Sequence, residues 1–190
     1  NLFGLKEFGN IYSRLGNPTV GALEARLTAL EEGAMCVALS SGTSAVMYSL
    51  INIMSQGDNF VTANQLYGGT YTMFDNILPE YGINSKKVDI TDLEAVEAAI
   101  DEKTRAIYCE TITNPGLVVA DISALADIAH SKGIPLIVDA TFTTSAILKP
   151  FEYGADIVVY SLTKWMSGHG RVIAGAVIEK GGFDWGNGNF

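Results

Sequence analysis

Short apolar runs alternate with helical segments along the whole chain, and this alternation limits the possible folds more than any other feature. The runs that predict strands cover residues 35–39, 59–63, 83–88, 105–110, 135–139, 155–159 and 172–178. Apolar residues at helical spacing predict helices over 18–32, 70–81, 91–102 and 122–132, with a further helix that opens at 40–44 and ends near 54. Strands that alternate with helices build a mostly parallel sheet covered on both faces, so we expect one doubly wound α/β domain.

The composition agrees with such a sheet and restricts the possible partners. Of the 190 residues, 48% are hydrophobic and 17% are charged, which suits central strands that are buried on both faces. The formal net charge of −9 argues against nucleic acid or an anionic membrane surface as the main partner. No signal peptide is recognisable, and no apolar run is long enough to span a membrane.

The cysteines and histidines do not indicate a metal site. Cys36 and Cys109 fall in apolar runs, so we predict that they are reduced core residues of a cytoplasmic protein. His130 and His169 lack the spacing of a metal pair, and no metal ligand is predicted.

Lys164 follows the run 155–159, so it lies just beyond the carboxyl end of a predicted strand, where open α/β sheets bind their ligands. Two hydroxyl residues, Ser161 and Thr163, are close to it in sequence, and glycines follow. A primary amine beside hydroxyls suits a phosphorylated aldehyde, because the amine can trap it as a Schiff base while the hydroxyls bind the phosphate. The sequence therefore predicts pyridoxal 5'-phosphate (PLP) as the cofactor.

Two further segments end where the same pocket would form. The run 135–139 finishes in Asp139, whose carboxylate could keep a pyridine nitrogen protonated. Ser41, Gly42 and Thr43 lie in a turn between a strand and a helix, and the free N–H groups of a helix N-terminus favour phosphate. Ordinary capping of the helix by Ser41 would explain the same turn.

Several segments, taken together and in order, resemble those of fold type I PLP-dependent enzymes, and more narrowly those of the cysteine and methionine metabolism family. The segments are Tyr12-Ser13-Arg14, Gly16-Asn17-Pro18-Thr19, Ser41-Gly42-Thr43, Leu66-Tyr67-Gly68-Gly69-Thr70, Glu110-Thr111, Asn114-Pro115, Asp139 and 161–170. The resemblance implies a three-layer large domain with a mostly parallel seven-stranded sheet, in which 172–178 forms a late antiparallel strand. It assigns 18–190 to this PLP-binding domain and places the family's small C-terminal domain outside the given chain.

The resemblance also implies roles for individual residues. Lys164, Tyr67 and Asp139 would be catalytic, with the ring of Tyr67 stacked on the pyridine and its hydroxyl able to transfer protons. The cofactor would be held by Ser41, Gly42, Thr43, Tyr67, Asn114, Asp139, Thr141, Ser161, Thr163 and Lys164. Residues 1–17 would form an irregular lead-in, from which Tyr12 and Arg14 reach across a dimer interface to the phosphate in the neighbouring subunit.

Without the resemblance, these residues have ordinary explanations. Tyr12 and Arg14 could be a surface pair on a loop, and Tyr67 could pack beside a glycine turn. Asn114 before a proline is a common turn residue, and a purely structural Thr141 would look the same in sequence.

The tail of the chain indicates a branch of the family. Gly181-Gly182-Phe183-Asp184-Trp185 with Gly188-Asn189-Phe190 most resembles the O-acetylhomoserine sulfhydrylases. This branch implies a γ-replacement transferase of methionine biosynthesis, which takes O-acetyl-L-homoserine and a sulfide donor to L-homocysteine and acetate in a homotetramer of active dimers. Cystathionine γ-synthase and methionine or cystathionine γ-lyase activities remain alternatives. A non-catalytic PLP- or nucleotide-binding module is the alternative from another class, although no Gly-x-Gly-x-x-Gly or Walker motif is present.

Three positions depart from the usual pattern of the family, and a fourth bears on one branch of it. Ala140 and Tyr160 stand where asparagine and histidine are common, and Arg171 stands where a small or acidic residue is usual. None of these three removes a predicted cofactor contact. Gly69 occupies the position of a cysteine that is typical of methionine γ-lyases, which counts against that activity.

Overall fold

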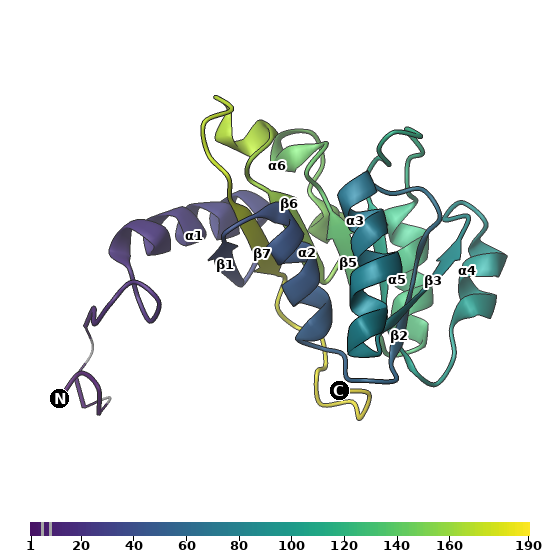
Figure 1. Cartoon of the computed structure of the whole chain (residues 1–190), viewed down its shortest axis with the longest axis horizontal. Helices are drawn as coiled ribbons and strands as arrows, with labels where there is room; N and C mark the ends of the chain where they lie inside the picture. Colours follow the sequence, from purple (N-terminus) through teal and green to yellow (C-terminus); the bar gives the residue numbers. More distant parts are fainter. Residues whose placement is uncertain (5, 8) are drawn as a thin grey trace.

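The computed structural model describes every residue of the chain except 5 and 8. Its centre is a seven-stranded sheet (Figure 1) with the strand order β1-β7-β6-β5-β4-β2-β3. The strands are β1 (Met35–Leu39), β2 (Asn59–Ala63), β3 (Asn84–Val88), β4 (Thr104–Glu110), β5 (Leu136–Asp139), β6 (Ile157–Ser161) and β7 (Gly175–Glu179). β7 runs antiparallel to its neighbours β1 and β6, and the other pairs are parallel. The predicted fold class, with its late antiparallel strand, is confirmed.

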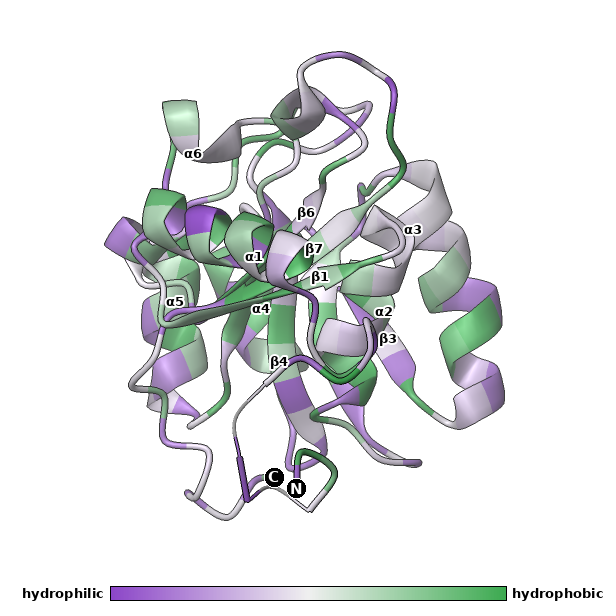
Figure 2. Ribbon diagram, turned by 90° about the vertical axis from the view of Figure 1, so that its left-hand side faces the viewer, coloured by the Kyte–Doolittle hydropathy of each residue, from purple (hydrophilic) through white to green (hydrophobic). Residues whose placement is uncertain are grey.

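Helices cover both faces of the sheet and complete three layers. They are α1 (Pro18–Glu31), α2 (Gly42–Ile51), α3 (Gly68–Thr72), α4 (Leu93–Ala99), α5 (Ile122–Ser131) and α6 (Thr144–Ile147). Figures 1 and 2 show α2 and α3 on one face and α5 on the opposite face. α2 contacts β6 and β7, whereas α5 contacts β4 and β5. This arrangement places the N-terminus of α2 beside the end of β6.

α1 begins and ends where the sequence predicts. The Asn17 side chain caps it by accepting hydrogen bonds from the N–H groups of Thr19 and Val20, and Pro18 occupies the first turn. The helix stops at Glu32, which adopts a left-handed conformation with φ 58°.

The prediction of a single helix over 70–81 is wrong in detail. The chain instead forms α3, a π-helical turn (η1, Met73–Ile77) and a 3-10 turn (η2, Leu78–Tyr81). Pro79 has no N–H to donate to the carbonyl of Asp75, four residues before it, so the α-helical hydrogen bonds cannot continue into η2. α4 is also shorter than the predicted 91–102, because Ile100 already has an extended conformation.

Two strands are displaced from their predicted ranges. β6 begins after 155–156 because Asp156 belongs to the preceding turn, where its carboxylate accepts a hydrogen bond from the N–H of Leu136 at 2.8 Å. Ser161 is therefore the last residue of β6 and not part of the following loop. β7 covers only the second half of the predicted run 172–178 and extends one residue beyond it.

The core between the layers is closely packed around large aromatic side chains. Phe74 makes edge-to-face contacts with Phe60 and Tyr108, at ring-centroid distances of 4.7 and 5.2 Å. Cys36 and Cys109 are free and buried, as predicted. Among the helices of the described residues, none has both the length and the apolar character that crossing a membrane requires.

Candidate active site

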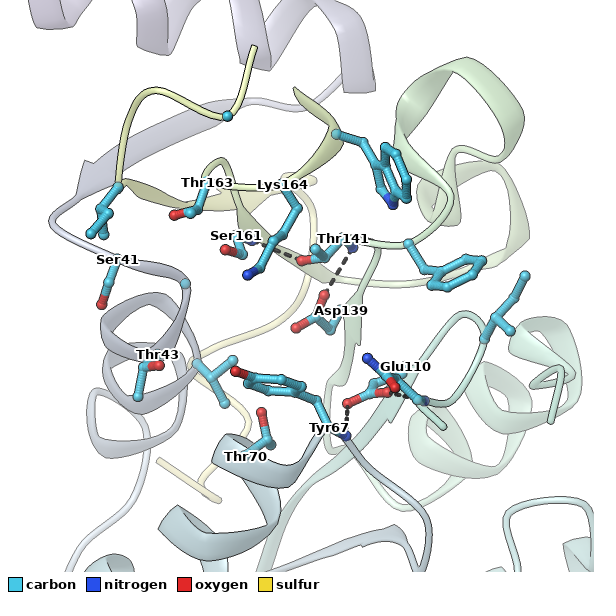
Figure 3. Close-up of a pocket in the computed structure, with 18 of the residues that line it drawn as sticks. Ser41, Thr43, Tyr67, Thr70, Glu110, Asp139, Thr141, Ser161, Thr163 and Lys164 are labelled. Carbon is cyan, nitrogen blue, oxygen red and sulfur yellow. Dashed lines mark hydrogen bonds between the residues drawn. The ribbon is translucent and has the colours of Figure 1, made fainter. Parts of the chain in front are cut away.

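A pocket of about 700 Å³ opens at the carboxyl ends of β4, β5 and β6, beside the N-terminus of α2. Figure 3 shows side chains converging on it from these elements and from the loops that follow them. Its volume is typical of a site for a small molecule. Ten residues predicted from the sequence line it: Ser41, Gly42, Thr43, Tyr67, Asn114, Asp139, Thr141, Ser161, Thr163 and Lys164.

Lys164 extends from the loop after β6 into this pocket, and Figure 3 shows its amine close to Ser161 and Asp139. The backbone around it is fixed, because the N–H of Lys164 donates to Ser161 O at 3.1 Å and Ser167 Oγ donates to Lys164 O at 3.1 Å. No salt bridge in the described part of the chain includes this amine. Its position leaves the nitrogen accessible to a carbonyl compound in the pocket.

Two threonine hydroxyls around Lys164 have structural partners. Thr163 Oγ1 donates to Ala174 O at 3.2 Å and accepts from the N–H of Ala174 at 3.1 Å, which ties the Lys164 loop to the segment before β7. Thr141 Oγ1 accepts from the N–H of Ser161 at 2.8 Å. Both side chains therefore shape the pocket as well as lining it.

The turn before α2 is pressed against the end of β6. A Cβ atom at Gly42 would lie 2.4 Å from Ser161 Cβ, and one at Gly175 would lie 2.0 Å from Ser41 O, so both positions require glycine. Ser41 Oγ accepts a hydrogen bond from the N–H of Ser44 at 3.0 Å, which is the ordinary capping interaction. Capping and a place in the pocket thus occur together, and the helix N-terminus faces a site where an anion would be stabilised.

Asp139 ends β5 with its carboxylate directed into the pocket (Figure 3). Its oxygens accept from the N–H of Thr141 at 2.9 Å and from Tyr108 Oη at 3.4 Å. Burial raises the pKa of Asp139, and the hydrogen bonds from Thr141 and Tyr108 oppose that shift. Burial also raises the pKa of Tyr108 well above 10, so this hydroxyl remains a donor. A carboxylate in these surroundings favours a cationic partner.

Tyr67 reaches the pocket from the loop between β2 and α3. Its ring lies over Gly69, where a Cβ atom would come within 2.8 Å of Tyr67 Cε1. The ring is 49% exposed and lines the pocket opposite Lys164, as Figure 3 shows. The missing side chain at position 69 therefore leaves space for this ring.

Glu110 is a site residue that the sequence prediction did not include. It is the last residue of β4 and 5% exposed, and its two carboxylate oxygens accept from the N–H of Tyr67 at 2.7 Å and from the N–H of Asn114 at 3.1 Å. Burial raises the pKa of Glu110 to about 7; the charge of Asp139 adds to this shift and the two N–H groups oppose it. A signal existed in the sequence, because Glu110 and Asp139 both end predicted strands, and the two residues are register partners in the sheet.

An apolar rim surrounds the mouth of the pocket and was also missed. Its residues are Ile112, Phe142, Trp165 and Ile173. Trp165 is 67% exposed and Ile173 is 76% exposed. Ile112 and Phe142 lie in loops, Trp165 begins a short 3-10 helix (Trp165–Ser167), and Ile173 precedes β7, so no single pattern predicted that they would gather here.

Tyr12 and Arg14 do not line the pocket. Arg14 Nη2 donates to Tyr12 Oη at 2.6 Å, and the guanidinium lies 5.3 Å from the centroid of that ring. Figure 1 shows the N-terminal segment extending away from the sheet. Within one subunit the two side chains form the surface pair that is the ordinary explanation, and their action in a neighbouring subunit remains a prediction.

Tyr160, one of the departures from the family pattern, points away from the pocket. Its side chain is fully buried, and its hydroxyl donates to Glu31 Oε1 at the end of α1. Burial raises the pKa of Glu31 above its ordinary value, and this hydrogen bond opposes the shift. The tyrosine therefore joins α1 to the central sheet and leaves the lining of the site unchanged.

The pocket has the groups that a phosphorylated pyridine aldehyde requires. A helix N-terminus pressed against Ser161 without intervening side chains suits a phosphate, the Lys164 amine suits an aldehyde carbon, and the Asp139 carboxylate suits a ring nitrogen. The three-layer fold and this set of groups define a fold type I PLP-dependent enzyme domain.

Comparison with known families supports the assignment to PLP-dependent enzymes. The family model described as "Cys/Met metabolism PLP-dependent enzyme" matches residues 1–189, and the chain belongs to this family. The prediction of PLP as the cofactor is confirmed at the level of the family.

The similar proteins include sulfhydrylases and a lyase. The O-acetyl-L-homoserine sulfhydrylase of Leptospira meyeri is 48% identical over 189 residues, which are 100% of this chain and 43% of that protein. A solved putative O-acetylhomoserine (thiol)-lyase from Campylobacter jejuni, with N'-pyridoxyl-lysine-5'-monophosphate, has a TM-score of 0.91 at 43% identity and covers 95% of this chain and 45% of that one. A cystathionine γ-lyase from Lactobacillus plantarum, in complex with L-serine, has a TM-score of 0.88 at 41% identity, covering 93% and 46%. The chain thus spans less than half of the length of these proteins.

Proposed function

We propose that the protein is a PLP-dependent transferase that replaces the acetate of O-acetyl-L-homoserine with sulfide and forms L-homocysteine. The observation that supports this most directly is the presence of Lys164 and Asp139 in one pocket beside the N-terminus of α2. The similarity to a protein named O-acetyl-L-homoserine sulfhydrylase supports the choice of reaction.

Three parts of the chain hold the cofactor in this proposal. The backbone N–H groups at Gly42 and Thr43 would bind the phosphate, the Lys164 amine would bind the aldehyde carbon, and the Asp139 carboxylate would pair with the ring nitrogen. When bound, PLP supplies an electron sink that stabilises negative charge on the substrate carbons next to the amino group.

The remaining steps are proton transfers by residues of this chain. Once the amino group of the substrate has displaced the Lys164 amine from the aldehyde carbon, that amine is free to take a proton from the α-carbon of the substrate and then to move a proton from the β-carbon, because Lys164 lines the same pocket. Tyr67 donates a hydrogen bond to the acetyl group as it leaves the γ-carbon. The apolar rim formed by Ile112, Phe142, Trp165 and Ile173 limits the access of water while the γ-carbon awaits its sulfur nucleophile.

The oligomer and the compartment are also proposals. Tyr12 and Arg14 act in the site of a neighbouring subunit, so an active unit needs at least two copies, and two such pairs form a tetramer. The protein works in the cytoplasm, where thiols such as Cys36 and Cys109 stay reduced.

A second candidate is γ-elimination or cystathionine synthesis. The similarity to a cystathionine γ-lyase structure favours it, with a TM-score of 0.88, and every residue named above can serve it. Product analysis separates the reactions. The proposed enzyme forms homocysteine from O-acetylhomoserine and sulfide, a synthase forms cystathionine when cysteine is supplied, and a lyase releases ammonia and an α-keto acid.

Borohydride reduction followed by peptide mapping tests the cofactor. We expect the purified whole protein to be yellow, to lose that colour on reduction, and to yield a pyridoxyl label on Lys164. A colourless protein that stays unlabelled after PLP is added would contradict the proposal. A labelled protein that turns over none of these substrates would instead be a non-catalytic PLP-binding module.

A further inference from the structure

Glu110 is buried beside the reacting groups, yet the proposed reaction uses none of its atoms. Its side chain lines the pocket at the end of β4 with 5% exposure. No Lys, Arg or His of the described residues forms a salt bridge with it. A buried carboxylate without a cation needs other partners to offset the loss of water, and its partners here are two backbone N–H groups.

The two N–H groups belong to different loops. One is that of Tyr67, which follows β2 and lies 43 residues from Glu110 in the chain. The other is that of Asn114, in the loop after β4. β2 and β4 are neighbours in the sheet, so a carboxylate at the end of one strand can join the loops that leave both. Figure 3 shows Glu110 below Asp139 and its hydrogen bond to the backbone of Tyr67.

Hydrogen bonds between its own residues close the Asn114 loop, and the side chain of Gln65, two residues before Tyr67, packs against Gly116 in this loop. The N–H of Thr113 donates to Val118 O at 2.9 Å, and the N–H of Val118 donates to Thr113 Oγ1 at 2.9 Å. Those bonds close the loop without fixing its distance from Tyr67. Among the hydrogen bonds of the described residues, those of the Glu110 carboxylate connect the two loops.

The chemistry of the bridge requires a carboxylate. An ionised glutamate has two acceptor oxygens, one for each N–H group. A glutamine of the same shape has one acceptor and one NH₂ donor, and the donor would face an N–H group. An aspartate keeps both acceptors but is shorter by one methylene, so it cannot reach both loops from the same backbone position.

We propose that Glu110 is a positioning residue whose carboxylate sets the places of Tyr67 and Asn114 relative to Lys164. It acts through these two residues, and the proposed reaction uses none of its own atoms. The inference rests on the proposed function only in that Tyr67 acts on the substrate.

Several ionisable groups surround this carboxylate. Asp139 faces it from β5, Tyr108 and Cys109 precede it on β4, and Lys164 enters the same pocket from the loop after β6. Burial raises the pKa of Glu110 to about 7. The fraction of molecules with an intact bridge therefore changes around neutral pH.

Peptide-resolved hydrogen–deuterium exchange of the whole protein, without added substrate, tests the bridge directly. In Glu110→Gln we expect exchange about tenfold faster in peptides that contain the amides of Tyr67 and Asn114, because their protecting acceptor is lost. Asp121→Asn is the matched control, since Asp121 also accepts a backbone hydrogen bond, from the N–H of Ala124 at 3.1 Å, and does not line the pocket. Unchanged exchange at both amides in Glu110→Gln would overturn the inference.

The wild-type protein provides a second measurement, which does not depend on the folding of a variant. After correction for the intrinsic rate, both amides should gain protection together between pH 6 and pH 8, as Glu110 becomes ionised. Protection that changes at one of the two amides and not at the other would overturn the inference, because a single carboxylate accepts from both. Neither measurement requires turnover, so failure of the bridge is distinguishable from failure of the proposed reaction.

A double-mutant cycle with the active holoenzyme tests the route through Tyr67. Glu110→Gln should lower kcat about 100-fold with KM nearly unchanged, because displacement of a reacting group by about 1 Å has effects of this size. In a Tyr67→Phe background the same substitution should cost less than about tenfold, since coupled residues are not additive. Fully additive losses would show that Glu110 does not act through Tyr67.

Discussion

Carboxylate side chains at the two ends of the central sheet have opposite pKa shifts. At the amino ends of the strands, Asp101 accepts hydrogen bonds from Asn59 Nδ2 at 2.9 Å and from the N–H of Lys103 at 3.0 Å, and it pairs with Lys86 Nζ at 2.6 Å. These donors, with that of Lys86 first, hold the pKa of Asp101 well below its ordinary value. At the carboxyl ends, burial raises the pKa of both Glu110 and Asp139.

The amino end of the sheet therefore contributes to stability, whereas the carboxyl end provides groups for function. A carboxylate that is surrounded by donors contributes to the folded state and has little capacity left for a ligand. A carboxylate with few donors and a raised pKa makes folding less favourable at neutral pH, but it can bind a cation or a backbone N–H group strongly. The carboxyl end of the sheet therefore provides a ligand-binding site, and its buried carboxylates lower the stability of the folded state at neutral pH.

The largest expected effect compares the lysines at the two ends. Lys164→Ala should lower kcat about 10⁴-fold, because general acid–base catalysis alone contributes up to about that factor. Lys86→Ala, which removes the partner of Asp101, should leave kcat within about twofold while weakening a partly exposed ion pair by less than about 1 kcal/mol. Initial rates with O-acetylhomoserine and sulfide measure the first effect, and urea unfolding measures the second. Comparable rates for the two variants would break the comparison.

The next effect compares the carboxylates themselves. Asp139→Asn should lower kcat about 10²- to 10³-fold, the usual loss when one electrostatic stabiliser is removed from an active site. Asp101→Asn should keep its activity and lose about 1 to 2 kcal/mol of unfolding free energy, because hydrogen bonds from Asn59 and Lys103 are weakened. The same assays apply. An inactive Asp101→Asn variant that still folds would contradict the assignment of function to one end.

The pH dependence of stability sharpens the comparison further. The pKa of Glu110 is raised from 4.5 to about 7, so the folded state binds this proton more tightly than the unfolded chain does. The resulting stabilisation is complete below pH 4.5 and is lost as the pH rises through about 7. Relative to the wild type, Glu110→Gln should therefore gain about 3 kcal/mol in unfolding free energy between pH 4 and pH 8. Urea unfolding of the cofactor-free protein measures this gain, and a difference that stays flat with pH would count against it.

The smallest effect concerns a glycine at the site. Gly42→Ala should destabilise the protein by about 2 kcal/mol, because the new Cβ would lie 2.4 Å from Ser161 Cβ and the turn must move. It should also weaken PLP binding, since the same movement displaces the N-terminus of α2. Gly21→Ala is the control, because a Cβ there meets nothing within 4 Å and should stabilise α1 by about 0.5 to 1 kcal/mol. Thermal unfolding and PLP titration of both variants provide the test, and equal behaviour would rule out the close packing at Gly42.

Local sequence features predicted most of the elements. Asn17 and Pro18 marked the start of α1, and Asp121 marked that of α5, because caps act on N–H groups within the next three residues. One range failed where the effect was less local, because Asp156 delayed the start of β6 by binding the N–H of Leu136 from another strand. The range 70–81 failed because the apolar periodicity continues past Pro79, whereas the α-helical hydrogen bonds do not.

The candidate site was predictable to a similar extent. Lys164 and Asp139 were found because each follows or ends a strand and has a side chain with distinctive chemistry. Glu110 ends a strand in the same way, but its partners are backbone N–H groups, which have no sequence signature. Tyr12 and Arg14 were predicted by resemblance, and a single subunit leaves them on the surface.

The sequence by itself determined the alternation of strands and helices, the class of the sheet and the residue types available at its carboxyl end, because these depend on periodicity, capping and side-chain chemistry over short distances. Only the tertiary structure decided which of those residues meet. The close approach of Gly42 to Ser161 and the bridge from Glu110 to Tyr67 depend on strand order and register, which bring together atoms 43 residues apart in the case of the bridge. Pairing of neighbouring strands brings residues that are distant in sequence within hydrogen-bond distance, and the site is formed by such residues.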